Sequence, residues 1–140
     1  MCISLQKIWK TTIAAVFLTA VVVVTQINAA TVTKANDYIS TLVAGQSANH
    51  KLVFTTLNGV LEGQTIQLTF SSAFDTSLIT EDDVDINDYG SALTTAADCS
   101  GAENASVTIA ADVITVNVCP GDGGAIAALS EIIIDIGSQA

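Results

Sequence analysis

After residue 30 the chain consists of short segments in which apolar and polar residues alternate. The clearest examples are 64–70 (QTIQLTF) and the pair 105–110 and 113–118, which is interrupted by Ala111 and Asp112. A period of two places one set of side chains on a core face and the other set in water. Such segments, separated by turn residues, predict antiparallel β-strands.

Four further segments predict strands, and one predicts a short helix. Strands are expected at 31–42, 50–57, 84–89 and 131–136, and residues 91–97 are expected to pair at a sheet edge. Asp75 or Thr76 is suited to cap a single helical turn that ends at Leu78. Roughly seven to nine short strands predict an immunoglobulin-like or fibronectin-like antiparallel β-sandwich, with a jelly roll as the alternative.

The first 29 residues have the composition of a cleavable signal helix. Lys7 and Lys10 precede an apolar run at 13–24, and small residues at 27–30 follow it. This order predicts a secretory signal peptide at 1–29, with cleavage after Ala29 or Ala30, and a β-sandwich domain at 30–140. The run is shorter than the roughly 20 residues that a membrane-spanning helix needs. We therefore predict a secreted or cell-surface protein that contacts a membrane only through this segment before cleavage.

The excess of acidic residues after residue 30 argues against anionic partners. All 14 carboxylates of the chain lie after residue 30, where Lys34 and Lys51 are the only basic residues other than a single His. Nucleic acids and anionic membrane surfaces are recognised by clustered Lys and Arg, so neither is expected to bind. The aliphatic content of the alternating runs still provides enough apolar surface for a folded core.

Cys99 and Cys119 bracket the hairpin predicted at 105–118. The third cysteine, Cys2, lies in the predicted signal peptide, so two cysteines remain after cleavage. An even number in an exported chain predicts a disulfide, and closing a loop of this length is worth about 3 kcal/mol in the chain-entropy model. The alternative is a pair of buried free thiols. A Cys-based metal site is not indicated, because the chain has no Cys-x-x-Cys spacing.

Acidic and amide residues are concentrated just before and within the strand predicted at 84–89. One interpretation is a solvated acidic face, because in a strand Asp83, Asp85 and Asn87 point away from Val84 and Ile86. The alternative is a calcium site, and apart from calcium we expect no cofactor. The candidate calcium ligands are Asp82, Asp83, Asp85, Asn87 and Asp88.

No residue pattern predicts catalysis. His50 is the only histidine, and we expect it at the surface or in a turn. A Gly-x-Ser-x-Gly elbow is absent, and the glycines at 121–124 lack the Lys of a phosphate-binding loop. Asn104-Ala105-Ser106 matches a glycosylation sequon, a pattern that also arises by chance.

The isoleucines at 132–134 have two interpretations. Flanked by Glu131 and Asp135, they predict a buried core strand with acidic neighbours that limit aggregation. Alternatively, this strand pairs with a neighbouring subunit, as happens when strand addition builds fibres.

Several segments taken together resemble a known kind of domain. The order NHKLVFTT (49–56), GVLEGQTIQLTF (59–70), DVDI (83–86) and EIIIDIG (131–137) is similar to the leading β-sandwich module of large secreted or surface-displayed bacterial proteins. The resemblance implies the sandwich fold and an envelope or adhesin-like role. Such modules usually continue beyond the final Ile-Gly strand, so this chain is either a stand-alone version or part of a longer protein.

We therefore expect an exported, non-enzymatic structural or adhesive module of the cell surface or extracellular space. Its expected partners are envelope or matrix components, and self-association is a further option. One alternative is a subunit of an extracellular filament assembled by strand exchange. Another is a calcium-dependent ligand-binding domain.

Overall fold

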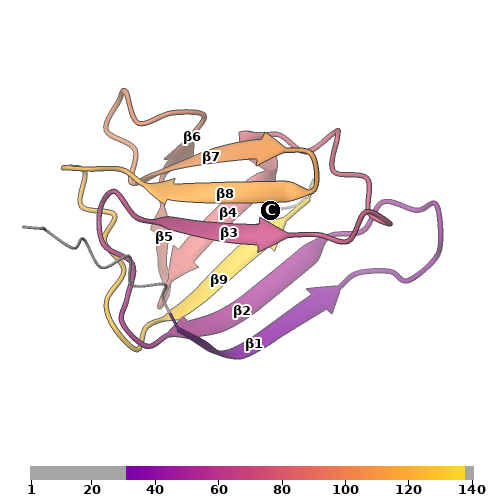
Figure 1. The fold of residues 1–140 in the computed structure, drawn as a ribbon, viewed down its shortest axis with the longest axis horizontal. Helices are drawn as coiled ribbons and strands as arrows, with labels where there is room; N and C mark the ends of the chain where they lie inside the picture. The colour runs from indigo at the N-terminus through magenta and orange to yellow at the C-terminus, as the bar shows by residue number, and fades with distance from the viewer. Residues whose placement is uncertain (1–30, 138–140) are drawn as a thin grey trace, which may run out of the picture.

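The computed structural model describes residues 31–137, which form two β-sheets packed face to face (Figure 1). The predicted signal peptide at 1–29 and its cleavage site lie outside the described residues. Between residues 31 and 137, no helix has the length and apolarity needed to cross a membrane.

The larger sheet has five strands in the order β1-β2-β9-β4-β5, with every neighbouring pair antiparallel. Its strands are β1 (Val32–Ile39), β2 (His50–Thr56), β4 (Val84–Asp88), β5 (Ser91–Leu93) and β9 (Glu131–Ile136). Each central strand turns alternate residues inward, as the period-two pattern requires. On β9, for example, Ile132 and Ile134 are fully buried while Glu131 is exposed.

The smaller sheet has four strands in the order β3-β8-β7-β6. These are β3 (Thr65–Thr69), β6 (Thr95–Ala96), β7 (Ala105–Ala110) and β8 (Val113–Val118). The predicted hairpin is β7 and β8, and Ala111 in its tight turn has a left-handed φ of 50°. The two-residue strand β6 pairs with β7 in parallel, within the segment that the sequence predicts to lie at an edge.

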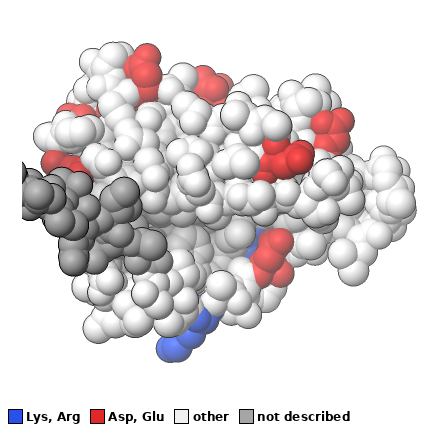
Figure 2. All heavy atoms as spheres, in the orientation of Figure 1, with Lys and Arg blue, Asp and Glu red and all other residues white. Residues whose placement is uncertain are grey.

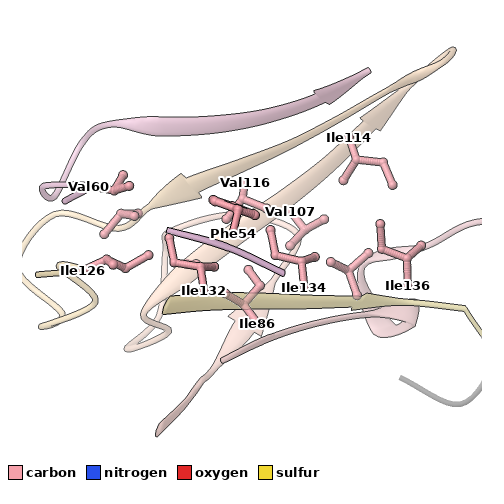
Figure 3. Close-up of a cluster of buried hydrophobic side chains, with 13 residues drawn as sticks. Phe54, Val60, Ile86, Val107, Ile114, Val116, Ile126, Ile132, Ile134 and Ile136 are labelled. Carbon is pink, nitrogen blue, oxygen red and sulfur yellow. The ribbon is translucent and has the colours of Figure 1, made fainter. Parts of the chain in front are cut away.

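The core lies between the two sheets (Figure 3). Ile132, Ile134 and Ile136 project from β9 toward Val107 of β7 and Val116 of β8. Burying an aliphatic side chain of this size contributes about 1.5–3 kcal/mol, so this cluster is the main stabilising feature of the fold. The two-sheet sandwich predicted from the sequence is therefore the observed architecture.

The predicted disulfide joins Cys99 to Cys119, with 5.4 Å between their Cα atoms. Its position beside β7 and β8 holds the loop between β6 and β7 against the end of the hairpin. Cys119 is completely buried, and its backbone N–H donates to the carbonyl oxygen of Asn104 at 2.9 Å. A buried disulfide indicates that the protein folds in an oxidising environment of the extracellular type.

The isoleucine run at 132–134 lies in a central strand. β9 is hydrogen-bonded to β2 on one side and to β4 on the other, so neither of its edges is open to a neighbouring subunit. The interpretation as a buried core strand is confirmed. An open strand edge exists, but at a different place in the fold, as described below.

The segment Asp75–Leu78, predicted to form a single helical turn, contains one hydrogen-bonded turn and no helix. The N–H of Ile79 donates to the carbonyl oxygen of Thr76 at 3.1 Å. The Asp75 carboxylate accepts the N–H of Ser77 at 3.0 Å in an Asx turn, which is the contact expected of a capping residue. A short 3-10 helix, η1 (Glu81–Asp83), follows a few residues later. Thr80 starts it, because both its N–H and its hydroxyl donate to the Asp83 carboxylate, at 3.0 and 2.9 Å.

Candidate functional site

Two loops lie together at one end of the sandwich, at the right of Figure 1, and a groove is formed between them. One loop connects β1 to β2 across residues 40–49, and the other leaves β3 across residues 70–80. The space between them is about 500 Å³. Neither loop contains a charged residue other than Asp75, so the groove is unusual on a chain with a formal net charge of −10.

The rim of this groove is apolar and exposed. Leu42 and Val43 lie on the first loop and are 89% and 64% exposed, while Leu78 on the second loop is 87% exposed. Single exposed aliphatic residues are common on protein surfaces, but several around one concave site indicate a binding surface. We call these three residues the apolar rim.

The floor of the groove is aromatic. His50, Phe70 and Phe74 all border the groove, and the ring of His50 lies edge-on to both phenyl rings, with centroids 5.2 and 5.3 Å away. The two phenyl rings are 6.3 Å apart. Edge-to-face aromatic contacts of this kind add about 0.5–1.5 kcal/mol beyond the area they bury, so they fix the shape of the floor.

His50 was expected at the surface or in a turn, and this prediction is wrong. It is the first residue of β2, its side chain is directed inward and it is only 7% exposed. The register of the β1–β2 pair places Asp37 on the same inner face, and the Asp37 carboxylate meets Nδ1 of His50 at 2.9 Å. A buried polar ring needs a partner of this kind, because an unpaired one would lose its hydration without compensation.

The carboxylate that orients Nδ1 gives His50 one feature of a catalytic base. However, within residues 31–137 no hydroxyl or thiol hydrogen-bonds to its Nε2, so no nucleophile is paired with the ring. The edge-on phenyl rings also enclose it. The arrangement supports a structural role for His50, which is to close the inner face of the sandwich beneath the groove.

The second loop is held in place by two contacts. The buried Thr76 donates its hydroxyl hydrogen to the carbonyl oxygen of Ala111, in the turn of the β7–β8 hairpin. The N–H of Phe74 donates to the carbonyl oxygen of Ser71 at 2.9 Å. These contacts, together with the Asx turn at Asp75, fix the side of the groove that carries Leu78.

The candidate calcium ligands point in several directions. Asp83 is bound to Thr80, as described above, and the Asn87 side-chain oxygen accepts the N–H of Gly90 at 2.7 Å. Asp88 accepts the hydroxyl hydrogen of Ser130, and Asp85 lies on the outer face beside Asp135 of β9. Across residues 31–137, no three His, Cys, Asp or Glu side chains are grouped to hold a metal ion. Calcium binding by Asp82, Asp83, Asp85, Asn87 and Asp88 stays a prediction.

Asn104, the asparagine of the sequon, has a structural role because both polar atoms of its side chain are hydrogen-bonded. Its side-chain oxygen accepts both the N–H and the hydroxyl hydrogen of Thr94, at 3.1 and 3.2 Å, and its side-chain amide donates to the carbonyl oxygen of Asp122 at 2.7 Å. This contact uses the nitrogen that a glycan would modify. Asn104 therefore acts as a clamp between three loops beside the disulfide.

The glycine-rich turn at 121–124 also has a structural explanation. The carboxylate of Glu62 accepts the N–H groups of Gly121 and Gly123, at 2.8 and 3.1 Å. The donors that would bind an anion in a phosphate loop are therefore occupied by a side chain of the same molecule.

Comparison with known proteins gave no match: no family model, no curated protein and no solved structure is similar to this chain at a significant level. The resemblance to leading modules of bacterial surface proteins therefore rests on the sequence motifs alone and stays a prediction.

Proposed function

We propose that this protein is an exported, non-enzymatic β-sandwich module that adheres to a neighbouring envelope or matrix component through the groove between loops 40–49 and 70–80. In sandwich proteins of the immunoglobulin-like class, to which we assign it, loops at the end of the sheets often carry the binding surface. The observation that supports the proposal is the apolar rim of Leu42, Val43 and Leu78 around a concave aromatic floor.

The chemistry of the groove defines the ligand class. The floor is built from Phe70, Phe74 and the edge of His50, and the rim is aliphatic. An extended peptide segment with apolar side chains fits such a surface, because it buries those side chains without bringing charge into the groove. Asp75, the one carboxylate along the groove, would favour a basic residue at one end of that segment.

An adhesive module also needs resistance to unfolding outside the cell. The disulfide and the Asn104 clamp hold together the loops next to β7 and β8. These loops lie at the end of β3 and β8 that is opposite the groove. The groove loops can therefore present exposed apolar side chains while the opposite end of the smaller sheet is held by covalent and hydrogen-bonded contacts.

The test is direct binding to the groove, with an exposed leucine elsewhere as the matched control. The uncharged dye Nile red serves as a probe of apolar surface, and washed envelopes of the producing cells serve as the biological surface. The double variant Leu42→Ser with Leu78→Ser removes two rim side chains. The control Leu61→Ser changes a residue that is 60% exposed in the loop at the other end of β2 and β3.

We expect the rim variant to lose at least tenfold in dye affinity and in retention on envelopes, while Leu61→Ser binds as the unmodified protein does. All three proteins should unfold at the same temperature, because the replaced side chains are exposed. Equal binding by the rim variant and the unmodified protein would refute the proposed role of the groove.

A further inference from the structure

The outer edge of β3 is an unpaired strand edge. β3 is hydrogen-bonded to β8 on one side. At the two ends of this pair, the N–H of Val118 donates to the backbone carbonyl oxygen of Gln64, and the N–H of Phe70 donates to that of Asp112. Hydrogen bonds alternate along an antiparallel pair, so Thr65, Gln67 and Thr69 direct their N–H and C=O groups away from β8. Among residues 31–137, no backbone group beyond the ladder with β8 meets these three residues.

The other edges of the two sheets are protected in the ways that natural proteins use. Edge strand β1 has an irregular register between Thr33 and Asn36 and carries Lys34. Edge strands β5 and β6 have only three and two residues. By contrast, β3 has five residues in an unbroken register with β8, and it contains no charge and no proline.

The inward side chains of β3 are also incompletely covered. Ile66 and Leu68 face the core but are only partly buried, whereas Ile114 and Val116 on the neighbouring strand are 0% and 1% exposed. The difference shows that the sandwich is open on the side of β3. Another strand placed along this edge would both bind the free backbone groups and cover these two side chains.

Charge and sequence symmetry identify the strand that fits. The sequence of β3 is nearly palindromic, because a central amide is flanked on each side by an aliphatic residue and then a threonine: Thr65-Ile66-Gln67-Leu68-Thr69. In an antiparallel pairing of two copies centred on Gln67, each Thr faces a Thr, each Ile faces a Leu, and Gln67 faces its own counterpart. Two molecules with a formal net charge of −10 repel each other, so they associate most readily through an uncharged surface.

The surface around the outer edge of β3 is largely uncharged, as such an association requires. No charged residue occurs in β3, β7 or β8. Figure 2 shows the face formed by these strands, in the orientation of Figure 1, as a largely uncharged area with carboxylates toward its margins. Its outward side chains are mainly hydroxyls and amides, including Thr65, Gln67, Thr69, Thr108 and Thr115.

We propose that two copies of this chain associate through β3, edge to edge and antiparallel, about a two-fold axis at Gln67. The pairing joins the two smaller sheets into one continuous sheet and forms about six backbone hydrogen bonds, two for each facing pair. Because the groove lies beyond the end of β3 at Phe70, the two grooves of the dimer lie at opposite ends of the shared edge. Such a dimer would bridge two ligands, and its avidity would exceed the affinity of one groove.

The test is crosslinking of the full chain, expressed in a secreting host and purified with its native disulfide intact. Gln67→Cys places a thiol next to its own counterpart across the proposed axis. The control Thr108→Cys places a thiol on the same face but on β7, one strand away from the β3–β8 pair. We expect mild oxidation to convert Gln67→Cys to a covalent dimer at least tenfold faster than Thr108→Cys.

A second pair of variants tests the same contact without a cysteine. Gln67→Lys brings two ammonium groups together at the axis, and Thr108→Lys adds the same charge away from it. In sedimentation experiments we expect the unmodified protein and Thr108→Lys to form dimers at high concentration, and Gln67→Lys to remain monomeric. Both positions are exposed, so both variants are expected to fold.

Three results would overturn the proposal. The first is that the unmodified protein stays monomeric at all accessible concentrations. This result would also be obtained if β3 bound only strands of other proteins. The second is equal crosslinking of Gln67→Cys and Thr108→Cys. The third is a dimer that Thr108→Lys disrupts and Gln67→Lys does not. None of these depends on ligand binding by the groove, so failure here is distinguishable from failure of the proposed adhesive function.

Discussion

The two sheets of this sandwich differ in charge and in the closure of their edges. The five-stranded sheet carries Lys51 and Asp135, which form an exposed ion pair at 3.1 Å, and its edges are irregular or short. The four-stranded sheet has no charged residue in any strand and leaves the outer edge of β3 without a neighbouring strand. The difference indicates that the larger sheet provides the closed core of the molecule, while the smaller sheet provides a surface suited to contact with another chain.

The largest effect is expected in the core of the five-stranded sheet. Ile134→Ala removes a fully buried side chain from the central strand β9 and should lower the free energy of unfolding by about 4 kcal/mol. Ile66→Ala on the open edge strand should cost about half as much, because the side chain is only partly buried. Denaturant unfolding of dilute samples measures both values. Equal losses would show that β3 is as well covered as β9.

The disulfide is expected to have the next largest effect. The double variant Cys99→Ala with Cys119→Ala opens a loop with a sequence separation of 20 and should lower the free energy of unfolding by about 3 kcal/mol. Addition of reductant to the unmodified protein should lower its unfolding midpoint to that of the double variant. A reductant effect on the double variant itself would mean that the disulfide is not the group responsible.

Asn104 connects the loops next to the disulfide, and its loss should have a smaller effect. Asn104→Ala removes all three side-chain hydrogen bonds of the clamp and should cost about 2 kcal/mol, because Thr94 and Asp122 lose their partner. The control Asn36→Ala removes one exposed hydrogen bond, and its effect should be within about 0.5 kcal/mol. An Asn104→Ala variant as stable as the control would exclude the clamp.

The smallest effect concerns pH and the 3-10 helix that leads into β4. The hydrogen bonds from the backbone N–H and then the side chain of Thr80 lower the pKa of Asp83 below its usual value of 3.8. A group with a lowered folded-state pKa stabilises the protein above its unfolded-state pKa, and this stability is lost as the pH falls through the folded-state value. The unmodified protein should therefore be more stable than Asp83→Asn at neutral pH, and the difference should vanish in strong acid. Unfolding curves from about pH 7 to about pH 2 measure it, and a difference that grows in acid would contradict the assignment.

The strands and the disulfide were predictable because both follow from short-range patterns. Alternation within 64–70 or 131–136 identifies a strand without knowledge of its neighbours, and after residue 30 Cys99 and Cys119 are the only two cysteines that can pair. The single turn at 75–78 was predictable for the same reason, because the Asp75 carboxylate accepts the N–H of Ser77 as a capping residue does, although no helix follows it.

The groove and the burial of His50 were not predictable, because they depend on contacts between segments that are distant in the sequence. Asp37 meets His50 only through the register of β1 with β2, which the irregularity near Thr33 shifts. Phe74 reaches the ring of His50 from a loop that follows another sheet. One signal existed in the sequence: Ile39 and Asp37 lie two residues apart and so share one side of β1, which directs the Asp37 carboxylate inward.

Amide hydrogen exchange along β3, followed by NMR at increasing protein concentration, tests the role of the uncharged sheet most directly. Edge pairing predicts that the amides of Ile66 and Leu68 are protected at every concentration, because they bond to β8. The amides of Thr65, Gln67 and Thr69 should exchange freely in dilute samples and become protected as dimers form. Exchange at these three amides that does not change with concentration would contradict the account.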